Sequence, residues 1–225
     1  MIEIQDLKKT YNGKIEALKG ISFRIEKGEI ALFLGPNGAG KTTAIKIILG
    51  LRRADSGKIS LLSHNIGYVP EGEIGKKDWR VEDYLEFLAQ LREVQSVEDR
   101  VNNVLEKYKA KEMRRRRLRE LSKGMYQKIK WIQAVLSDPE ILILDEPTSG
   151  FDPMGKVEFR NWIMEKKEQG RTILITSHLL DEMQKIGDTY IIINKGLIVD
   201  KGRIDEMKGK ALEEHFYEVV KESQE

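Results

Sequence analysis

The sequence of 225 residues predicts an α/β fold: a mixed, mainly parallel sheet, an antiparallel β subdomain at the N-terminus and an inserted α-helical subdomain. Apolar runs without polar alternation predict the parallel sheet, because they are typical of strands that helices cover on both faces. These runs are 30–34, 141–144, 173–175 and 191–193. Segment 78–137 lacks such runs, which predicts the helical insertion.

The first 30 residues show the pattern of strands with one buried face. Ile21, Phe23 and Ile25 alternate with polar residues. Successive side chains of a strand point to opposite faces, so this alternation predicts a half-buried strand. We expect these strands to form the antiparallel subdomain.

The middle and the end of the chain show helical spacing instead. One predicted helix carries Val81, Tyr84, Leu85, Leu88 and Leu91, and another carries Met125, Ile129, Ile132 and Leu136. Ser96 is expected to cap a helix between them. Further helices are predicted over 156–169, 179–186 and 211–220. We therefore expect a single domain, with a catalytic core (1–77 and 138–225) and a helical subdomain (78–137).

A glycine-rich phosphate loop follows the first buried run. It reads Gly35-Pro36-Asn37-Gly38-Ala39-Gly40-Lys41-Thr42-Thr43 and matches G-x-x-x-x-G-K-[ST] in full. Glycines let backbone N–H groups close around phosphate oxygens, and the start of the following helix adds its own N–H groups. Lys41 is predicted to reach the β- and γ-phosphates, and the Thr42 hydroxyl to ligate Mg²⁺. A glycine-rich turn with a chance lysine is the alternative interpretation.

Ionisable side chains follow two of the other buried runs. Asp145 and Glu146 come directly after 141–144, and His178 comes shortly after 173–175. Ligands of open α/β sheets bind at the carboxyl ends of strands. In a P-loop enzyme, Asp145 would hold Mg²⁺ through water, and Glu146 would orient and deprotonate the attacking water. Solvated acids leading into a turn, and a structural histidine, are the alternatives.

Composition narrows the function classes. Net charge is +2, from 39 Lys+Arg against 37 Asp+Glu, so no strong field indicates a nucleic-acid partner. Cysteine is absent, which excludes a disulfide framework and a thiol nucleophile. The N-terminus does not resemble a signal peptide, and no run approaches the roughly 18 apolar residues of a membrane span. The basic run 114–117 has acidic neighbours and no interleaved aromatics, which favours a solvated helix face.

Together these motifs resemble the nucleotide-binding subunit of an ABC transporter, a family built on a P-loop NTPase core. The resemblance extends from Tyr11 to about Gly202, with the motifs in the family's order. Leu121-Ser122-Lys123-Gly124-Met125 resembles the family signature, usually written L-S-G-G-Q. Residues 141–146 resemble the Walker B strand with its catalytic acid, and Ser149-Gly150-Phe151-Asp152 resembles the D-loop. His178 stands where the family has its switch histidine.

The resemblance implies a role for each matched residue. Tyr11 would stack on adenine, residues 35–43 would hold the phosphates, and Asp152 would belong to the nucleotide site. In the family, two subunits pair head to tail, so that Ser122 and Gly124 of one subunit touch the γ-phosphate bound by the other. Hydrolysis then weakens the dimer, and this would drive a conformational change in a coupled membrane partner.

Three positions depart from the family pattern. Glu71 replaces a glutamine that reaches Mg²⁺; a carboxylate can also ligate Mg²⁺, but a solvated turn is the alternative. Lys123 replaces a glycine, which would cost backbone strain if the site needs a positive φ. Met125 replaces a glutamine and cannot donate its ribose contact. Similar signatures occur among ABC-2-type exporters.

The expected function is an ATP-hydrolysing subunit that uses ATP and Mg²⁺ and works as a homodimer or heterodimer. It would power a separate transmembrane permease, with export favoured over import, and would lie in the cytoplasm on the inner face of the cell membrane. No nucleic-acid partner is expected. The alternative is a soluble ABC ATPase, for example in cofactor assembly.

Overall fold

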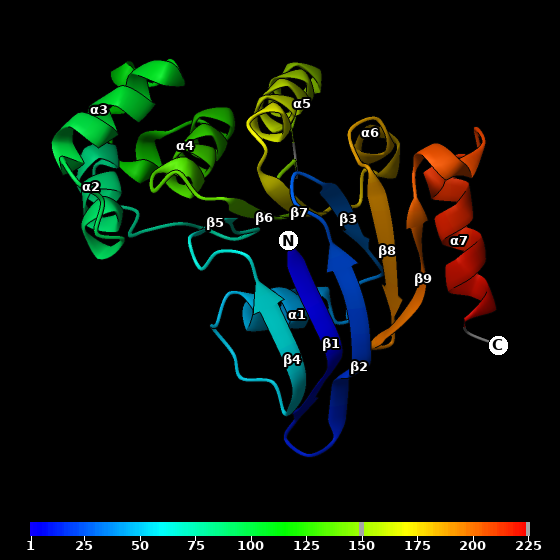
Figure 1. Ribbon diagram of the computed structural model, residues 1–225. Coiled ribbons are helices and arrows are strands. Elements are labelled where there is room, and N and C mark those ends of the chain that lie inside the picture. The colour runs from blue at the N-terminus through cyan, green and yellow to red at the C-terminus, as the bar shows by residue number, and fades with distance from the viewer. Residues whose placement is uncertain (149–150, 224–225) are drawn as a thin grey trace.

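A six-stranded sheet forms the centre of the computed structural model, which describes residues 1–148 and 151–223 (Figure 1). The strand order is β5-β6-β7-β3-β8-β9. In that order the strands are Ile66–Val69, Ile141–Asp145, Thr172–Thr176, Ile30–Leu34, Thr189–Asn194 and Leu197–Arg203. Neighbouring strands are parallel except β8 and β9, which are antiparallel. The predicted mixed, mainly parallel sheet is confirmed.

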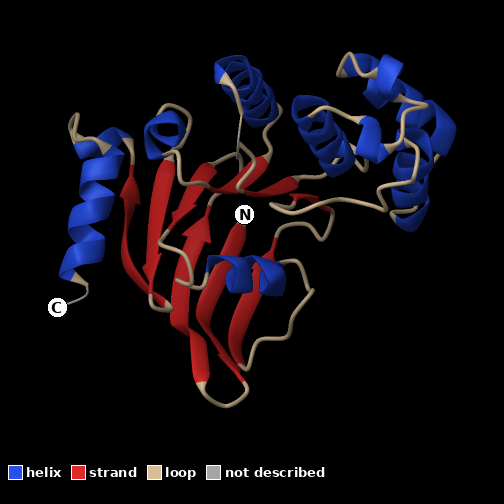
Figure 2. Cartoon of the chain, turned by 180° about the vertical axis from the view of Figure 1, so that it is seen from behind, coloured by secondary structure: helices blue, strands red, loops and turns tan. Residues whose placement is uncertain are grey.

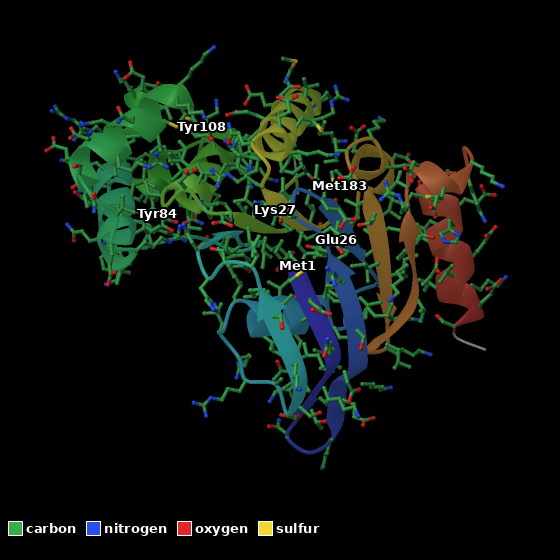
Figure 3. All side chains as sticks on the ribbon, viewed as in Figure 1. Met1, Glu26, Lys27, Tyr84, Tyr108 and Met183 are labelled. Atoms are coloured by element: carbon green, nitrogen blue, oxygen red, sulfur yellow. The ribbon has the colours of Figure 1, made fainter. Side chains whose placement is uncertain are left out.

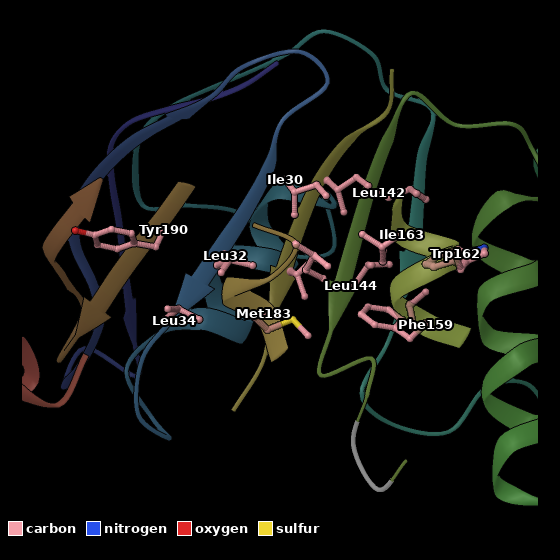
Figure 4. Packing of buried hydrophobic residues seen from close by; sticks show 14 of the residues in the cluster. Ile30, Leu32, Leu34, Leu142, Leu144, Phe159, Trp162, Ile163, Met183 and Tyr190 are labelled. Carbon is pink, nitrogen blue, oxygen red and sulfur yellow. The ribbon is translucent and has the colours of Figure 1, made fainter. Parts of the chain in front are cut away.

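The central strands are buried on both faces, as their apolar runs predicted. Every residue of β3, β6 and β7 is buried. In β3, Ile30, Leu32 and Leu34 pack into one core, while Ala31 and Phe33 pack into a second core on the opposite face. Figure 4 shows the first core, in which Phe159 and Trp162 of α5 lie beside Leu144 of β6.

Different elements cover the two faces of the sheet (Figure 2). The first core is closed by α5 (Pro153–Glu168), α6 (Leu180–Gln184) and α7 (Leu212–Glu222). The second core is closed by α1 (Lys41–Ile48) and by a three-stranded antiparallel sheet in the order β2-β1-β4. That sheet contains β1 (Ile2–Tyr11), β2 (Ile15–Ile25) and β4 (Ser56–Leu61), and the alternation along β2 buries Ile21, Phe23 and Ile25. The expected antiparallel subdomain is therefore present.

The segment predicted to be helical has its own hydrophobic core. It contains α2 (Val81–Leu91), α3 (Val97–Lys107), α4 (Lys123–Val135) and the 3₁₀ helices Lys111–Met113 and Leu118–Glu120. Figure 3 places Tyr84 and Tyr108 in this part of the chain, away from Met1 at the start of β1. On α4, Ile129 and Ile132 pack into the helical core, whereas Trp131 and Ala134 pack into the first core of the sheet. This helix therefore joins the two parts.

The prediction that the Ser96 side chain caps a helix is wrong. Ser96 occupies the position before α3, but its side chain makes no capping hydrogen bond. Its backbone has φ 49° and ψ 57°, in the left-handed region, whereas a capping serine normally has an extended backbone that turns its hydroxyl toward the helix.

Within the described residues, no helix has the length and apolar character needed to cross a membrane.

Candidate active site

The phosphate loop connects β3, which ends at Leu34, to α1, which begins at Lys41. Two of its glycines lie where no side chain fits. A Cβ atom at Gly35 would lie 2.3 Å from the carbonyl oxygen of Ile193, and one at Gly40 would lie 2.6 Å from that of Ala17. Gly40 also has φ 115°, a conformation that favours glycine. The tight loop therefore depends on contacts with distant strands as well as on its own turn.

The Lys41 amino group folds back over the loop. It donates hydrogen bonds to the carbonyl oxygens of Gly35, at 2.5 Å, and of Pro36, at 3.1 Å. Burial lowers the pKa of Lys41, while the charges of Glu146, Asp145 and Glu71 oppose that shift. The ammonium group of Lys41 is thus held in a cavity where three carboxylates favour its charged form.

The Asp145 carboxylate is fixed at the end of β6. Asp145 pairs in register with Thr176 of β7, and the Thr176 hydroxyl donates to Asp145 Oδ1 at 2.7 Å. Burial raises the pKa of Asp145, and the Thr176 hydrogen bond partly offsets this shift. The parallel register therefore holds one Asp145 oxygen in a defined orientation.

Glu146 turns out of the strand into an uncommon backbone conformation. Its φ is 48°, and its N–H donates to Thr176 Oγ1 at 3.0 Å. A non-glycine residue in this region costs of order 1–3 kcal/mol, and such residues cluster at functional sites. The strained turn brings the Glu146 side chain to the cavity where β6 ends.

Glu146 and His178 form a pair beside the cavity. The backbone N–H of His178 donates to Glu146 Oε2 at 3.3 Å, and the ring nitrogen Nε2 of His178 lies 3.1 Å from Glu146 Oε1. Oε1 is buried and has no aligned hydrogen-bond donor among the described residues. Burial raises the pKa of Glu146, while His178 opposes the rise. His178 thus lies against both oxygens of the Glu146 carboxylate at the edge of the cavity.

A cavity of about 400 Å³ brings most of the predicted residues together. Those that line it are Asn37, Gly38, Ala39, Gly40, Lys41, Thr42, Thr43, Glu71, Asp145, Glu146 and His178. Gly35 and Pro36 act through their carbonyl groups on Lys41. The cavity also has two lysines that the sequence analysis missed, Lys19 and Lys195. Lys195 lies in the turn between β8 and β9, and no local motif marks it.

Tyr11 lies outside the lining of this cavity. It ends β1, and its half-buried ring has Arg52 Cζ at 5.8 Å and Lys9 Nζ at 5.9 Å from the ring centroid. Asp55 holds this end of the strand, because its carboxylate accepts hydrogen bonds from Lys9 Nζ and the Thr10 N–H, each at 2.6 Å. The aromatic ring is therefore presented at the tip of the antiparallel sheet.

The oxygen donors in the cavity fit Mg²⁺ only together with a nucleotide. The Thr42 hydroxyl and the carboxylates of Asp145 and Glu71 line the same space. Within the described residues, no three His, Cys, Asp or Glu side chains gather closely enough to hold a metal ion by themselves. Mg²⁺ is ordinarily bound by one or two carboxylates with substrate phosphates and water, so this donor set is compatible with it.

The signature segment lies elsewhere, at the start of α4. Ser122 caps this helix, with its hydroxyl accepting from the Met125 N–H at 3.3 Å. Lys123 has no positive φ, so the expected strain of replacing glycine does not arise. Among the described residues, the N–H groups of Lys123 and Gly124 make no hydrogen bond. The first turn of α4 therefore presents backbone N–H groups that can donate to a ligand.

A second cavity, of about 350 Å³, joins the signature to the D-loop. It is lined by Lys123, Gly124 and Asp152, among others, and none of the described residues lines both cavities. The Asp152 side chain caps α5 by accepting from the Gly155 N–H at 2.7 Å. Ser149 and Gly150, the first half of the predicted D-loop, lie outside the described residues. Within one chain, the signature and the phosphate loop are thus separate.

The fold and the first cavity define the class of the protein, a P-loop ATPase. Comparison with known proteins gives the family. The sequence profile of the ABC transporter family matches residues 18–149. An uncharacterized ABC transporter ATP-binding protein of Synechocystis sp. is 34% identical over 240 residues, which cover 98% of this chain and 67% of that protein. The chain belongs to the ABC transporter ATP-binding family, whose members are ATPases.

Two solved structures resemble the whole chain. One is described as the ATP-binding subunit of an ABC transporter, with a TM-score of 0.87 and 27% identity over 97% of this chain and 99% of that one. The other is cbiO1 of Clostridium perfringens, described as part of the ABC transporter complex cbiONQ. Its TM-score is 0.78 and its identity 27%, over 97% of this chain and 93% of that one. The P-loop ATPase fold extends over both parts of the chain.

Proposed function

We propose that this protein hydrolyses ATP with Mg²⁺ and closes around it as a head-to-tail dimer, which powers a separate transmembrane permease. Each ATP would lie between the phosphate loop of one subunit and the signature of the other. By this proposal the protein is cytoplasmic and reaches the inner face of the membrane through its permease. Its partner is a second copy or a related subunit, and no nucleic acid is involved.

One observation carries the dimer proposal: Gly124 has empty space where a side chain would lie, although nothing described in its own chain requires a glycine there. Its φ is not positive, and a Cβ atom built on it would meet nothing within 4 Å among residues 1–148 and 151–223. Neither backbone conformation nor packing within the chain therefore requires a glycine here. Together with the unbonded N–H groups of the first turn of α4, this favours the close approach of an anion from outside.

We assign the chemistry to the strand ends. Glu146 would accept a proton from the attacking water, and His178 would orient Glu146 and contact the γ-phosphate. Residues 35–43 would hold the phosphates, with Lys41 exchanging its loop carbonyls for phosphate oxygens. Tyr11 would stack on adenine from outside the cavity.

Mg²⁺ would be held by Thr42 and Asp145. Glu71 faces the same cavity and is the third proposed ligand. The ion would neutralise charge that develops on the phosphates. The chain's own part is to fix these oxygens: the Thr176 hydroxyl orients Asp145, and the phosphate loop orients Thr42.

Export is the proposed direction of transport. It is supported by the spelling of the signature, Ser122-Lys123-Gly124-Met125, which resembles that of ABC-2-type exporters. The membership of cbiO1 in a transporter complex supports a permease partner by analogy. We propose the division into a core (1–77 and 138–225) and a helical subdomain (78–137) because the middle segment has a hydrophobic core of its own.

The Glu146→Gln variant tests the proposed chemistry. It keeps the shape of the side chain but removes the proton acceptor, so ATP hydrolysis should fall by roughly a hundredfold or more while ATP affinity is retained. Phosphate release and nucleotide binding are the measurements. Hydrolysis in the variant comparable to the parent would remove Glu146 as the base, and absence of hydrolysis in the parent would contradict the proposed function.

A further inference from the structure

Three polar side chains on one face of α4 bind the main chain of the segment that carries Glu71. Tyr126, Lys130 and Gln133 are spaced four and three residues apart, which places them in a row along the helix. We call these three residues the α4 seam. Their partners lie between Tyr68, in β5, and Ile74, in the loop that follows.

Each member of the α4 seam has a main-chain partner. The Tyr126 hydroxyl accepts from the Ile74 N–H at 2.6 Å and lies 3.1 Å from the Ile74 carbonyl oxygen, to which it donates. Lys130 Nζ donates to the carbonyl oxygen of Glu71 at 3.1 Å. Because the seam holds the Glu71 main chain, the carboxylate stays at the cavity.

The third contact ties the seam to the helical core. Gln133 Nε2 donates to the carbonyl oxygen of Tyr68 at 3.3 Å, and Gln133 Oε1 accepts from the Tyr84 hydroxyl of α2. Close packing supports the same junction, since a Cβ atom at Gly67 of β5 would lie 2.1 Å from the Ala134 carbonyl oxygen. The helix and the strand therefore meet backbone to backbone beside the seam.

Lys130 is an unusual residue at such a junction. Its side chain is only 3% exposed, although lysine is rarely buried unless it is paired. Burial lowers its pKa to about 8, while the charges of Glu71 and Asp145 oppose the shift. An apolar side chain would fill the same space without this desolvation penalty, so packing alone does not account for a lysine here.

We propose that the α4 seam couples the two cavities: it holds the Glu71 loop and the first turn of α4 as one unit, so that a triphosphate beside Glu71 sets the position of Ser122. Lys130 and Tyr126 are positioning residues in this account, since neither is among the residues that line the first cavity. The inference rests on the proposed function, in which Ser122 serves the nucleotide of a second copy.

Two substitutions test the seam, and a third is their control. Tyr126→Phe removes only the hydroxyl, and Lys130→Met removes the amino group while filling most of its volume. Lys166→Met is the matched control, because Lys166 is a buried lysine (4% exposed) on α5 whose hydrogen bonds go to Glu165 and Gln169.

A split between binding and turnover is the expected result. Without Mg²⁺, the dissociation constant for ATP should stay within about twofold of the parent in every variant, because the phosphate loop is unchanged. Turnover at saturating MgATP should fall about tenfold or more in Tyr126→Phe and Lys130→Met, since small misplacements of reacting groups cost this much. ATP-driven dimerisation, measured by sedimentation in a Glu146→Gln background, should weaken in parallel, and Lys166→Met should match the parent.

The outcomes separate this inference from the proposed function. If the parent neither hydrolyses ATP nor dimerises with it, the proposed function fails. If the parent does both, and Tyr126→Phe and Lys130→Met match it within about twofold in turnover and dimerisation, the coupling role is refuted. An equal loss in Lys166→Met would also refute it, because general destabilisation would then be the cause. If Lys130→Met does not fold, Tyr126→Phe decides.

Discussion

Substituting Gly124 by alanine should change stability and function in opposite directions. Gly124 is the second residue of α4, its φ is not positive, and the space where a side chain would lie is open with respect to the described residues. Alanine at a helical position is more favourable than glycine by roughly 0.5–1 kcal/mol, because less backbone entropy is lost on folding. Because no residue of the described part of the chain lies within 4 Å of such a Cβ atom to offset this gain, Gly124→Ala should stabilise the isolated subunit by up to that amount.

The same methyl group should weaken the ATP-bound dimer. In the proposed dimer, the N–H groups of the first turn of α4 approach the γ-phosphate of the other subunit, and an added Cβ atom would hold them away. Loss of one hydrogen bond to a charged group costs about 1.5–3 kcal/mol, which corresponds to a loss of roughly tenfold to a hundredfold in the dimerisation constant.

Two assays on one protein measure these effects. Urea unfolding without nucleotide gives the stability change, and sedimentation of the Glu146→Gln and Gly124→Ala double variant with ATP gives the dimerisation constant. A variant that gains stability but dimerises as well as its Glu146→Gln parent would refute the close approach at Gly124. A variant that loses stability would show that Gly124 has a packing role within its own chain.

Two further predictions concern the tip of the antiparallel sheet. Tyr11→Ala should raise the dissociation constant for ATP by the equivalent of about 1–3 kcal/mol, as expected for loss of a base-stacking ring; an unchanged constant in a fluorescence titration would assign Tyr11 to structure alone. Asp55→Asn should lower the free energy of unfolding near neutral pH, because folding lowers the pKa of Asp55. The hydrogen bond from Lys9 contributes most to this shift, and the one from the Thr10 N–H comes next. A carboxyl whose pKa is lowered on folding stabilises above its unfolded pKa, and this contribution is lost as pH falls through its folded pKa. Urea unfolding of both proteins should therefore converge in acid, and a difference that persists there would contradict this cause.

The sheet was predictable because its strands are buried on both faces. In runs such as 191–193, consecutive apolar side chains point to both faces of the strand, so neither face is suited to contact with water. The parallel core could therefore be inferred without knowing the strand order. The site residues Asp145 and Glu146 were predictable from the same kind of run, since two acids after four apolar residues mark the carboxyl end of a strand, and Asp145 is the last residue of β6. By contrast, Ser96 has the right residue type for a cap but the wrong backbone conformation, which local sequence does not specify.

The contacts that join distant segments could not be predicted from the sequence. Lys19 and Lys195 reach the cavity from β2 and from the β8–β9 turn, and only the folded sheet brings them near the phosphate loop. A lysine such as Lys130 would be expected on a solvated helix face, yet it is buried where α4 meets the loop that carries Glu71. Such residues depend on packing between elements far apart in the chain, for which periodicity gives no signal.

Sedimentation of the Glu146→Gln variant with ATP, with ADP and without nucleotide tests the central claim most directly. The claim is that the triphosphate completes a site that one chain leaves in two separate cavities. We predict a dimer with ATP and a monomer in the other two conditions, because only the γ-phosphate bridges the phosphate loop and the first turn of α4. A protein that binds ATP to saturation and stays monomeric, or that dimerises equally with ADP, would contradict the account.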